Sequence, residues 1–269
     1  AKVTVIEMAG QMLPGADPEV AQALEREFRR KKITVRTGTR FDELKVDGKG
    51  VRVRVRSGEQ PDELRADQVL VAIGRRPLSE DLGLAEAGVA TDAKGFVQVD
   101  ARRVTSVPSV RAIGDLAGGP LLAHKASEEG VAAAEWIAGH ERPALDPLKI
   151  PGCIYAQPQV AWIGLTEAQA KERYGEVRVG RFPFTASGKA VASAHTAGFA
   201  KVVAEPRFGE IVGAHLVGHG ATELIAEIAL AMTLEATTSE IAATCHAHPT
   251  LSEAILEAAL AAEGRSLNF

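Results

Sequence analysis

The chain has 269 residues, of which 31 are Lys or Arg and 35 are Asp or Glu, and its net charge is −4. With 46% apolar and 25% charged residues, this composition is typical of a soluble globular protein and excludes fibrous and disordered classes. Nucleic acids and anionic membranes require a basic excess on one face, so the acidic balance argues against both as partners. No apolar run in the sequence approaches the roughly 18 residues that a membrane span needs.

Only two cysteines occur, Cys153 and Cys245, and neither stands in a Cys-X-X-Cys motif. Two cysteines are too few for a disulfide framework, so we expect buried free thiols and a reduced, cytoplasmic setting. Residues 1–7 predict a strand and not a signal peptide. A zinc site at Cys245, His246 and His248 is disfavoured, because these closely spaced ligands have no fourth partner at the usual spacing, and we predict no bound metal.

The first 150 residues predict strands that alternate with helices, as in pieces of an α/β sheet. Strands are expected at 3–6, 33–37, 51–56, 69–73 and 110–113, and helices at 18–32 and 124–138. The run 69–73 is continuously apolar, as in a strand that is buried on both faces. The ribbon 51–56 alternates valine with arginine, so its valines should face a core. In the second helix, the side chains expected to face inward are Ala126, Val131, Ala134 and Ile137.

The pattern changes after a linker that contains Pro143 and Pro147. Strands are expected at 159–163, 177–184, 199–204 and 211–217, and helices at 221–235, 238–245 and 252–262. Strands followed by a block of helices indicate an α+β domain. The chain is therefore expected to combine α/β pieces with a C-terminal α+β domain.

Three features of the first half point to a nucleotide. Glu7 ends the first strand, where a carboxylate can accept hydrogen bonds from the ribose hydroxyls of NAD and repel the extra phosphate of NADP. Gly74 and Gly114 each end an apolar run, and glycine lets the backbone approach a ligand closely. Asp115 can accept hydrogen bonds from ribose or ribityl hydroxyls, and the helix that follows offers free N–H groups. A solvated carboxylate and two tight turns remain the alternatives.

The motif at 246–253 carries the clearest chemistry. His248 precedes a proline, and Glu253 lies at the start of the next predicted helix, from where its carboxylate can return to the imidazole ring. Such a carboxylate fixes the tautomer and raises the basicity of imidazole, as proton abstraction from a thiol near neutral pH requires. Alternatively, Ser252 or Thr250 can simply cap that helix.

Four segments, in their order and spacing, closely resemble the dihydrolipoamide dehydrogenases, a family of flavin disulfide oxidoreductases. They are Ala-Ile-Gly-Arg-Arg-Pro at 72–77, Ala-Ile-Gly-Asp at 112–115, Leu-Ala-His-Lys-Ala at 122–126 and Cys-His-Ala-His-Pro-Thr-Leu-Ser-Glu at 245–253. The resemblance covers the whole chain. It implies the C-terminal part of an α/β flavoprotein with two dinucleotide-binding domains, followed by an α+β interface domain. The implied division is the rear part of an NAD-binding domain at 1–77, the central segment of an FAD-binding domain at 78–146, and a domain at 147–269 that builds a homodimer.

The resemblance also implies roles for particular residues. Those that match the NAD site are Glu7, Phe41 and Gly74, and those that match FAD contacts are Gly114, Asp115, Leu121, Leu122, Ala123 and His124. His248 matches the acid/base that exchanges a proton with dihydrolipoyl thiols, and Glu253 matches its orienting carboxylate. In the family reaction, electrons pass from dihydrolipoamide through a cysteine pair and FAD to NAD+. The implied partner is the dihydrolipoamide acyltransferase of a 2-oxoacid dehydrogenase complex.

The sequence departs from the family pattern by omission. It holds no front FAD-binding unit with a glycine fingerprint, no redox-active cysteine pair, and no first strand of the NAD unit. We therefore expect a chain that does not turn over by itself. Glutathione reductase is an alternative, although basic residues would be expected at Glu7 for its NADP, and mercuric reductase would carry a vicinal cysteine pair near its C-terminus. A non-catalytic module for dimerisation and docking is the alternative from another class.

Overall fold

The computed structural model describes residues 1–268 and divides the chain into two compact units. The first unit joins residues 1–69 to residues 148–269, and the second holds residues 70–147. Both units contain helices, and the strands of the three sheets all belong to the first unit. No helix in the described part of the chain is long and apolar enough to cross a membrane.

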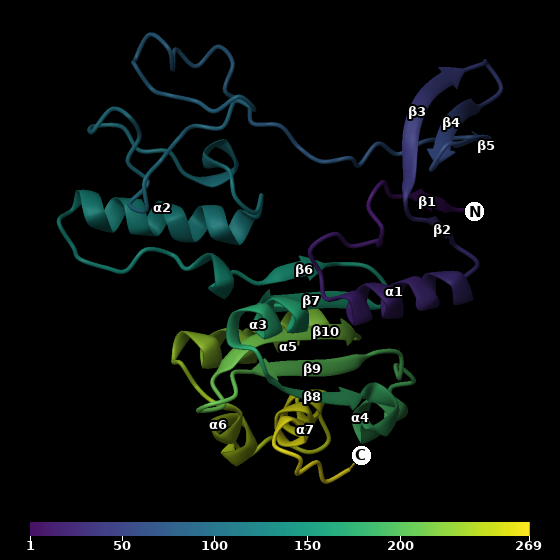
Figure 1. Ribbon diagram of the computed structural model, residues 1–269, viewed down its shortest axis with the longest axis vertical. Helices are drawn as coiled ribbons and strands as arrows, with labels where there is room; N and C mark the ends of the chain where they lie inside the picture. Colours follow the sequence, from purple (N-terminus) through teal and green to yellow (C-terminus); the bar gives the residue numbers. More distant parts are fainter. Residues whose placement is uncertain (269) are drawn as a thin grey trace. The chain divides into compact units, whose positions relative to one another are not determined.

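A five-stranded antiparallel sheet organises the first unit (Figure 1). In spatial order its strands are β6 (Gly152–Ile154), β7 (Gln159–Gly164), β10 (Ile211–Gly218), β9 (Phe199–Ala204) and β8 (Arg178–Pro183). The helices of this region are α3 (Glu167–Tyr174), α4 (Gly188–Ala192), α5 (Ala221–Thr233), α6 (Thr238–Ala243) and α7 (Glu253–Ala262). The four strands and three helices predicted here are confirmed to within two residues, whereas α3, α4 and β6 were not predicted.

Helices cover both faces of this sheet. Residues of α5 and α7 pack on the face that includes Ala161 and Leu216. Helix α1 (Pro18–Arg30) packs on the opposite face, against the neighbouring residues Val160 and Val217. Because both faces are covered, every residue of β9 and β10 is buried, which explains why these strands are apolar at nearly every position.

Gly180 in β8 allows α7 to lie directly on the strand backbone. A Cβ atom at this position would lie 1.8 Å from the carbonyl oxygen of Ala258 and 2.3 Å from the amide nitrogen of Ala262. Gly180→Leu should therefore lower the free energy of unfolding by at least ~2 kcal/mol, because α7 has to move away from the sheet. Urea unfolding measures the loss, with Gly188→Leu as the control, since open space surrounds Gly188. Equal losses in the two variants would contradict this packing.

The N-terminal part of the first unit contains two small sheets. Strands β1 (Thr4–Ile6) and β2 (Thr34–Arg36) pair in parallel, and β3 (Thr39–Val46), β4 (Val51–Ser57) and β5 (Gln60–Ala66) form an antiparallel meander. Strands β3 and β5 were not predicted, because their mostly exposed polar side chains show little alternation and their pairing with β4 decides their structure. The valine alternation of β4 is confirmed, since Val53 and Val55 are buried.

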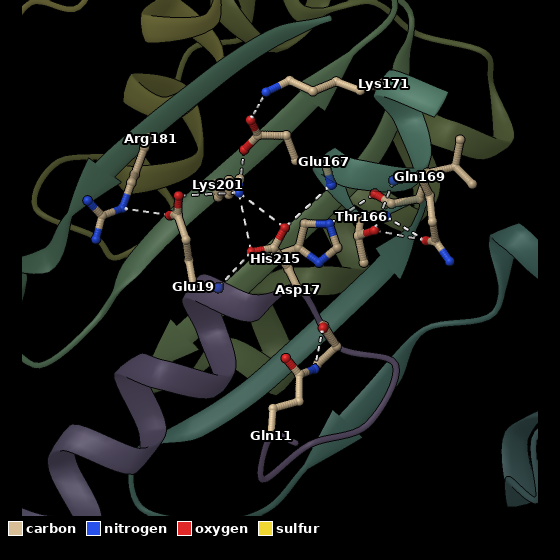
Figure 2. A network of polar contacts seen from close by, with 12 residues as sticks. Gln11, Asp17, Glu19, Thr166, Glu167, Gln169, Lys171, Arg181, Lys201 and His215 are labelled. Atoms are coloured by element: carbon tan, nitrogen blue, oxygen red, sulfur yellow. Dashed lines mark hydrogen bonds and ion pairs between the residues drawn. The ribbon is translucent and has the colours of Figure 1, made fainter. Parts of the chain in front are cut away.

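A buried ion cluster joins α1 to the large sheet (Figure 2). Lys201, only 1% exposed in β9, places its Nζ 2.8 Å from a Glu167 carboxylate oxygen, 3.1 Å from Asp17 and 3.6 Å from Glu19. Asp17 also caps α1, accepting the Glu19 N–H at 3.1 Å. Glu167 in turn binds the Lys171 ammonium on the surface of α3. One ammonium thus holds carboxylates from two helices.

The second unit contains the 3₁₀ helix η1 (Gly114–Ala117) and α2 (Ala123–Ile137). Two strands predicted in this part of the sequence are absent from the described structure. The strand expected at 69–73 is wrong: this run pairs with no strand of the described chain and is exposed, with Leu70 at 90% and Ile73 at 91%. The strand expected at 110–113 is also wrong, because Arg111 forms only an isolated bridge, to Val104. An apolar run forms a strand only where a neighbour accepts its backbone hydrogen bonds.

Helix α2 is confirmed, but the predicted inward face is wrong. Val131 is 50% exposed and Ile137 is 71% exposed. The buried residues of α2 are instead Lys125, Glu129, Ala132, Ala133 and Trp136. Two charged residues set this orientation, because they bind the backbone around η1.

Candidate functional site

The loop between α6 and α7 brings His248 and Glu253 together. The Nδ1 atom of His248 lies 2.8 Å from Oε1 of Glu253, which is the first residue of α7. The other carboxylate oxygen accepts the Thr250 N–H at 2.8 Å. The expectation that Glu253 returns to the ring is confirmed. The capping alternative is wrong, since Ser252 makes no side-chain cap bond and the Thr250 hydroxyl donates to the Ala247 carbonyl at 2.7 Å.

The ionisation of Glu253 decides which nitrogen of His248 can take a proton. The Thr250 N–H lowers the pKa of Glu253 below its usual 4.5, and the hydrogen bond from His248 adds to this effect, while burial opposes it. A carboxylate at Oε1 accepts, so Nδ1 carries the proton and Nε2 keeps its lone pair. The His248 side chain is 78% exposed. The pair can therefore accept a proton at Nε2 from an approaching acid.

A second histidine and glutamate pair lies beside the first, and sequence reasoning missed it. His246 Nε2 lies 2.8 Å from Oε1 of Glu227, a residue of α5. The two partners are far apart in the chain, so only the packing of α5 beside this loop reveals the contact. The only sign of this pair in the sequence was Glu227 itself, a charged residue in a predominantly apolar predicted helix.

The residues predicted to contact NAD lie in different units. Glu7 follows β1 at its carboxyl end, and its Oε1 accepts the Ala9 N–H at 2.7 Å. Phe41 lies in β3 and is 51% exposed. Gly74, with φ +119°, belongs to the second unit. A carboxylate fixed at the end of a parallel strand fits the hydroxyls of a nucleotide ribose.

A buried charged triad binds the backbone at Gly114, the first residue of η1. The Gly114 N–H donates to Glu129 Oε2 at 2.7 Å, and Glu129 Oε1 lies 3.1 Å from Lys125 and 3.2 Å from Arg103. Gly114 has φ +69°, and a Cβ atom there would lie 3.1 Å from the Ala126 Cβ, so the site requires glycine. Sequence reasoning missed this triad. The four-residue spacing of Lys125 and Glu129 on one helix face was the available signal.

The predicted FAD residues lie in η1 and at the start of α2. Arg75 Nη1 donates to Asp115 Oδ2 at 3.2 Å and to the Leu121 carbonyl at 3.4 Å, which links η1 to the start of α2. Leu122 is the N-cap residue and supplies no side-chain cap, so the backbone N–H groups that begin at Ala123, next to His124, suit an anionic or hydroxyl-rich ligand. In a flavin dinucleotide, the ribityl hydroxyls can donate to the Asp115 carboxylate, and the phosphate oxygens can accept from the N–H groups at the start of α2.

The possible metal ligands and the two cysteines complete the list of candidate site residues. In residues 1–268, no group of three or more His, Cys, Asp or Glu side chains is arranged to hold a metal ion. Cys153 and Cys245 are both free thiols, but the expectation that they are buried is wrong, since Cys153 is half-buried and Cys245 is exposed. Burial raises the pKa of Cys153, although Tyr155 opposes the shift.

Two family models match the chain. Residues 1–130 match "Pyridine nucleotide-disulphide oxidoreductase", and residues 150–259 match the dimerisation domain of the same family. A dihydrolipoyl dehydrogenase of Cupriavidus necator is 40% identical over 99% of this chain and 56% of its own length. Dihydrolipoyl dehydrogenases of Thermus scotoductus and Zymomonas mobilis are each 44% identical over 100% of this chain and 58% of their own length. The chain thus spans 56–58% of the length of these relatives.

Solved structures agree with this match. LpdA from Mycobacterium tuberculosis superposes with a TM-score of 0.89 and 26% identity, over 96% of this chain and 56% of its own. The flavoprotein disulfide reductase RclA from Escherichia coli has the same fold, with a TM-score of 0.87 and 23% identity over 96% of this chain and 59% of its own. The resemblance inferred from the sequence motifs is confirmed, and the chain belongs to the pyridine nucleotide-disulphide oxidoreductase family.

Proposed function

We propose that this chain forms part of a dihydrolipoyl dehydrogenase, an enzyme that oxidises the dihydrolipoyl groups of 2-oxoacid dehydrogenase complexes with NAD+. The observation that carries the proposal is the His248–Glu253 pair, whose hydrogen bond leaves Nε2 as the proton acceptor on an exposed ring. A dihydrolipoyl thiol must lose its proton before its sulfur attacks a disulfide, because the thiolate is the nucleophile. Similarity to dihydrolipoyl dehydrogenases over the whole chain supports this substrate class.

Within this proposal, three segments have different tasks. Residues 1–77 contribute Glu7 and Phe41 to an NAD site, and residues 78–146 contribute Gly114 and the start of α2 to an FAD site. When bound, the flavin supplies the electron transfer between the thiols and the nicotinamide. Residues 147–269 carry His248 and Glu253 and build a homodimer, which the match to a dimerisation domain supports. The partner that supplies the substrate is the dihydrolipoamide acyltransferase.

The test uses the completed protein, which we define as this chain preceded by the front segment of the Thermus scotoductus relative and loaded with FAD. Two catalytic efficiencies are compared, one for the reduction of NAD+ by dihydrolipoamide and one for the reduction of glutathione disulfide by NADPH. The first should be the larger. The reverse order would favour glutathione reductase. Inactivity with both substrate pairs, together with retained dimerisation, would favour a non-catalytic module.

Glu7 should select NAD+ over NADP+ in the completed protein. A carboxylate beside the ribose repels the 2′-phosphate of NADP+, so Glu7→Ala should raise the efficiency ratio of NADP+ to NAD+ by about 10- to 100-fold. Steady-state kinetics with both dinucleotides measure this ratio. Glu25→Ala serves as the control, because Glu25 pairs with Arg29 on the surface of α1. An unchanged ratio in Glu7→Ala would remove Glu7 from the NAD site.

A further inference from the structure

The two histidines of the 246–253 motif lie in opposite environments. The side chain of His246 is 4% exposed, whereas that of His248 is 78% exposed. His246 lies between α5 and the end of α6, where its Nε2 lies 2.8 Å from Glu227 Oε1 and its Nδ1 lies 2.9 Å from the Thr244 carbonyl oxygen. A ring held on both sides is fixed in orientation. It thereby fixes the short segment that leads to His248.

The partners of His246 determine the protons that its ring needs. A carbonyl oxygen and a carboxylate are both acceptors, so each ring nitrogen has to donate to make its hydrogen bond. A neutral imidazole carries only one N–H and would leave one nitrogen facing an acceptor without a proton, which is costly for a group so little exposed. The hydrogen bonds are therefore complete only in the imidazolium form. Its charge is balanced by Glu227, which is 30% exposed.

This charge also acts on the neighbouring pair. The carboxylates that face His246 come from two helices, Glu227 on α5 by direct contact and Glu253 on α7 through space. The strongest influence on Glu253 is the Thr250 N–H, which lowers the pKa of the carboxyl. The hydrogen bond from His248 and then the charge of His246 lower it further, while burial opposes them. The contact with Glu227 thus positions His248, and the charge acts on the carboxylate that orients it.

We propose that His246 is a positioning residue: Glu227 anchors its ring to α5, and the ring, in its imidazolium form, fixes the segment that carries His248 to Glu253. The proposal rests on the role proposed for His248 in proton exchange. In chemical terms, His246 touches no substrate and acts only through the His248–Glu253 pair.

Three variants separate the effect of the Glu227 contact from that of the His246 charge. They are studied in the 269-residue chain, labelled with ¹⁵N in histidine and ¹³C in glutamate side chains. Glu227→Ala should release the ring, and the ¹⁵N shifts of His248 should change from a dominant Nδ1–H tautomer to a mixture of both tautomers. Glu227→Gln should preserve that tautomer, since its amide oxygen still accepts from Nε2. His246→Gln can still donate to Glu227 but carries no charge, so the pKa of Glu253 should rise measurably.

Controls keep the outcome interpretable. His140→Gln removes an exposed histidine of the second unit and should change neither reading. Unchanged signals from the buried His215 show that a variant is folded, and Glu227→Gln provides the conservative comparison if Glu227→Ala unfolds. An unchanged His248 tautomer in Glu227→Ala, or an unchanged Glu253 titration in His246→Gln, would overturn the proposal. These spectra need neither substrate nor cofactor, so their result is independent of whether the completed protein oxidises dihydrolipoamide.

Discussion

His248→Gln should slow dihydrolipoamide-dependent NAD+ reduction by the completed protein by roughly 10²- to 10⁴-fold, the contribution that a positioned general base makes to a rate. Glutamine at this position can still donate to Glu253, but it cannot accept a thiol proton at neutral pH. The loss should appear in the turnover number, because the substrate still reaches an exposed loop.

The matched control for this prediction is His219→Gln. His219 is an exposed histidine of the same unit that stacks on His195 at 4.3 Å and belongs to neither proposed site. Steady-state rates at several pH values should show normal turnover for the control. If His248→Gln and the control had equal rates, the role of His248 in proton exchange would be refuted.

Lys201→Met should lower the free energy of unfolding of the chain by about 3–5 kcal/mol, the usual cost of removing one partner of a buried ion pair. Methionine keeps the apolar stem but leaves Asp17, which is 1% exposed, without its ammonium partner. Lys171→Met is the matched control, because Lys171 binds the same Glu167 from a side chain that is 55% exposed. Its cost should stay within about 0.5 kcal/mol.

Acid should weaken the same cluster. Lys171 and Lys201 lower the pKa of Glu167 in the folded chain below its usual 4.5, although burial opposes them. A group whose pKa is depressed by folding contributes its stability above the unfolded value, and this contribution is lost as the pH falls through the folded value. Urea midpoints should therefore decline below about pH 4.5 in the native chain, and less steeply in Lys201→Met. Parallel declines in both would contradict this account of the cluster.

Local patterns predicted the C-terminal domain well, because its signals lie within single elements. Alternation and helical spacing located β7 to β10 and α5 to α7. The apolar run 69–73 failed as a strand because pairing depends on a neighbouring chain segment, which the pattern of one run does not contain. The inward face of α2 failed because buried Lys125 and Glu129 bind the backbone around η1, a tertiary contact that outweighs apolar spacing.

In the candidate site, too, contacts between residues close in sequence could be predicted, whereas contacts between distant residues could not. Glu253 reaches His248 across five residues, so their contact could be predicted from the motif alone. Glu227 reaches His246 across nineteen residues and two helices, and the packing of α5 against the loop is needed to see it. The Glu129 support of Gly114 and the Lys201 cluster likewise depend on tertiary structure.

Rapid mixing of the completed protein with each reductant shows whether His248 exchanges the proton of a dihydrolipoyl thiol. Flavin reduction by dihydrolipoamide should slow in His248→Gln by the same 10²- to 10⁴-fold, because that direction requires a thiol to lose its proton. Flavin reduction by NADH should remain within about two-fold of the unmodified protein, because it involves no thiol proton. Proton exchange by His248 would be contradicted if dihydrolipoamide reduced the flavin equally fast in His248→Gln and in the unmodified protein. It would also be contradicted if His248→Gln slowed flavin reduction equally with dihydrolipoamide and with NADH.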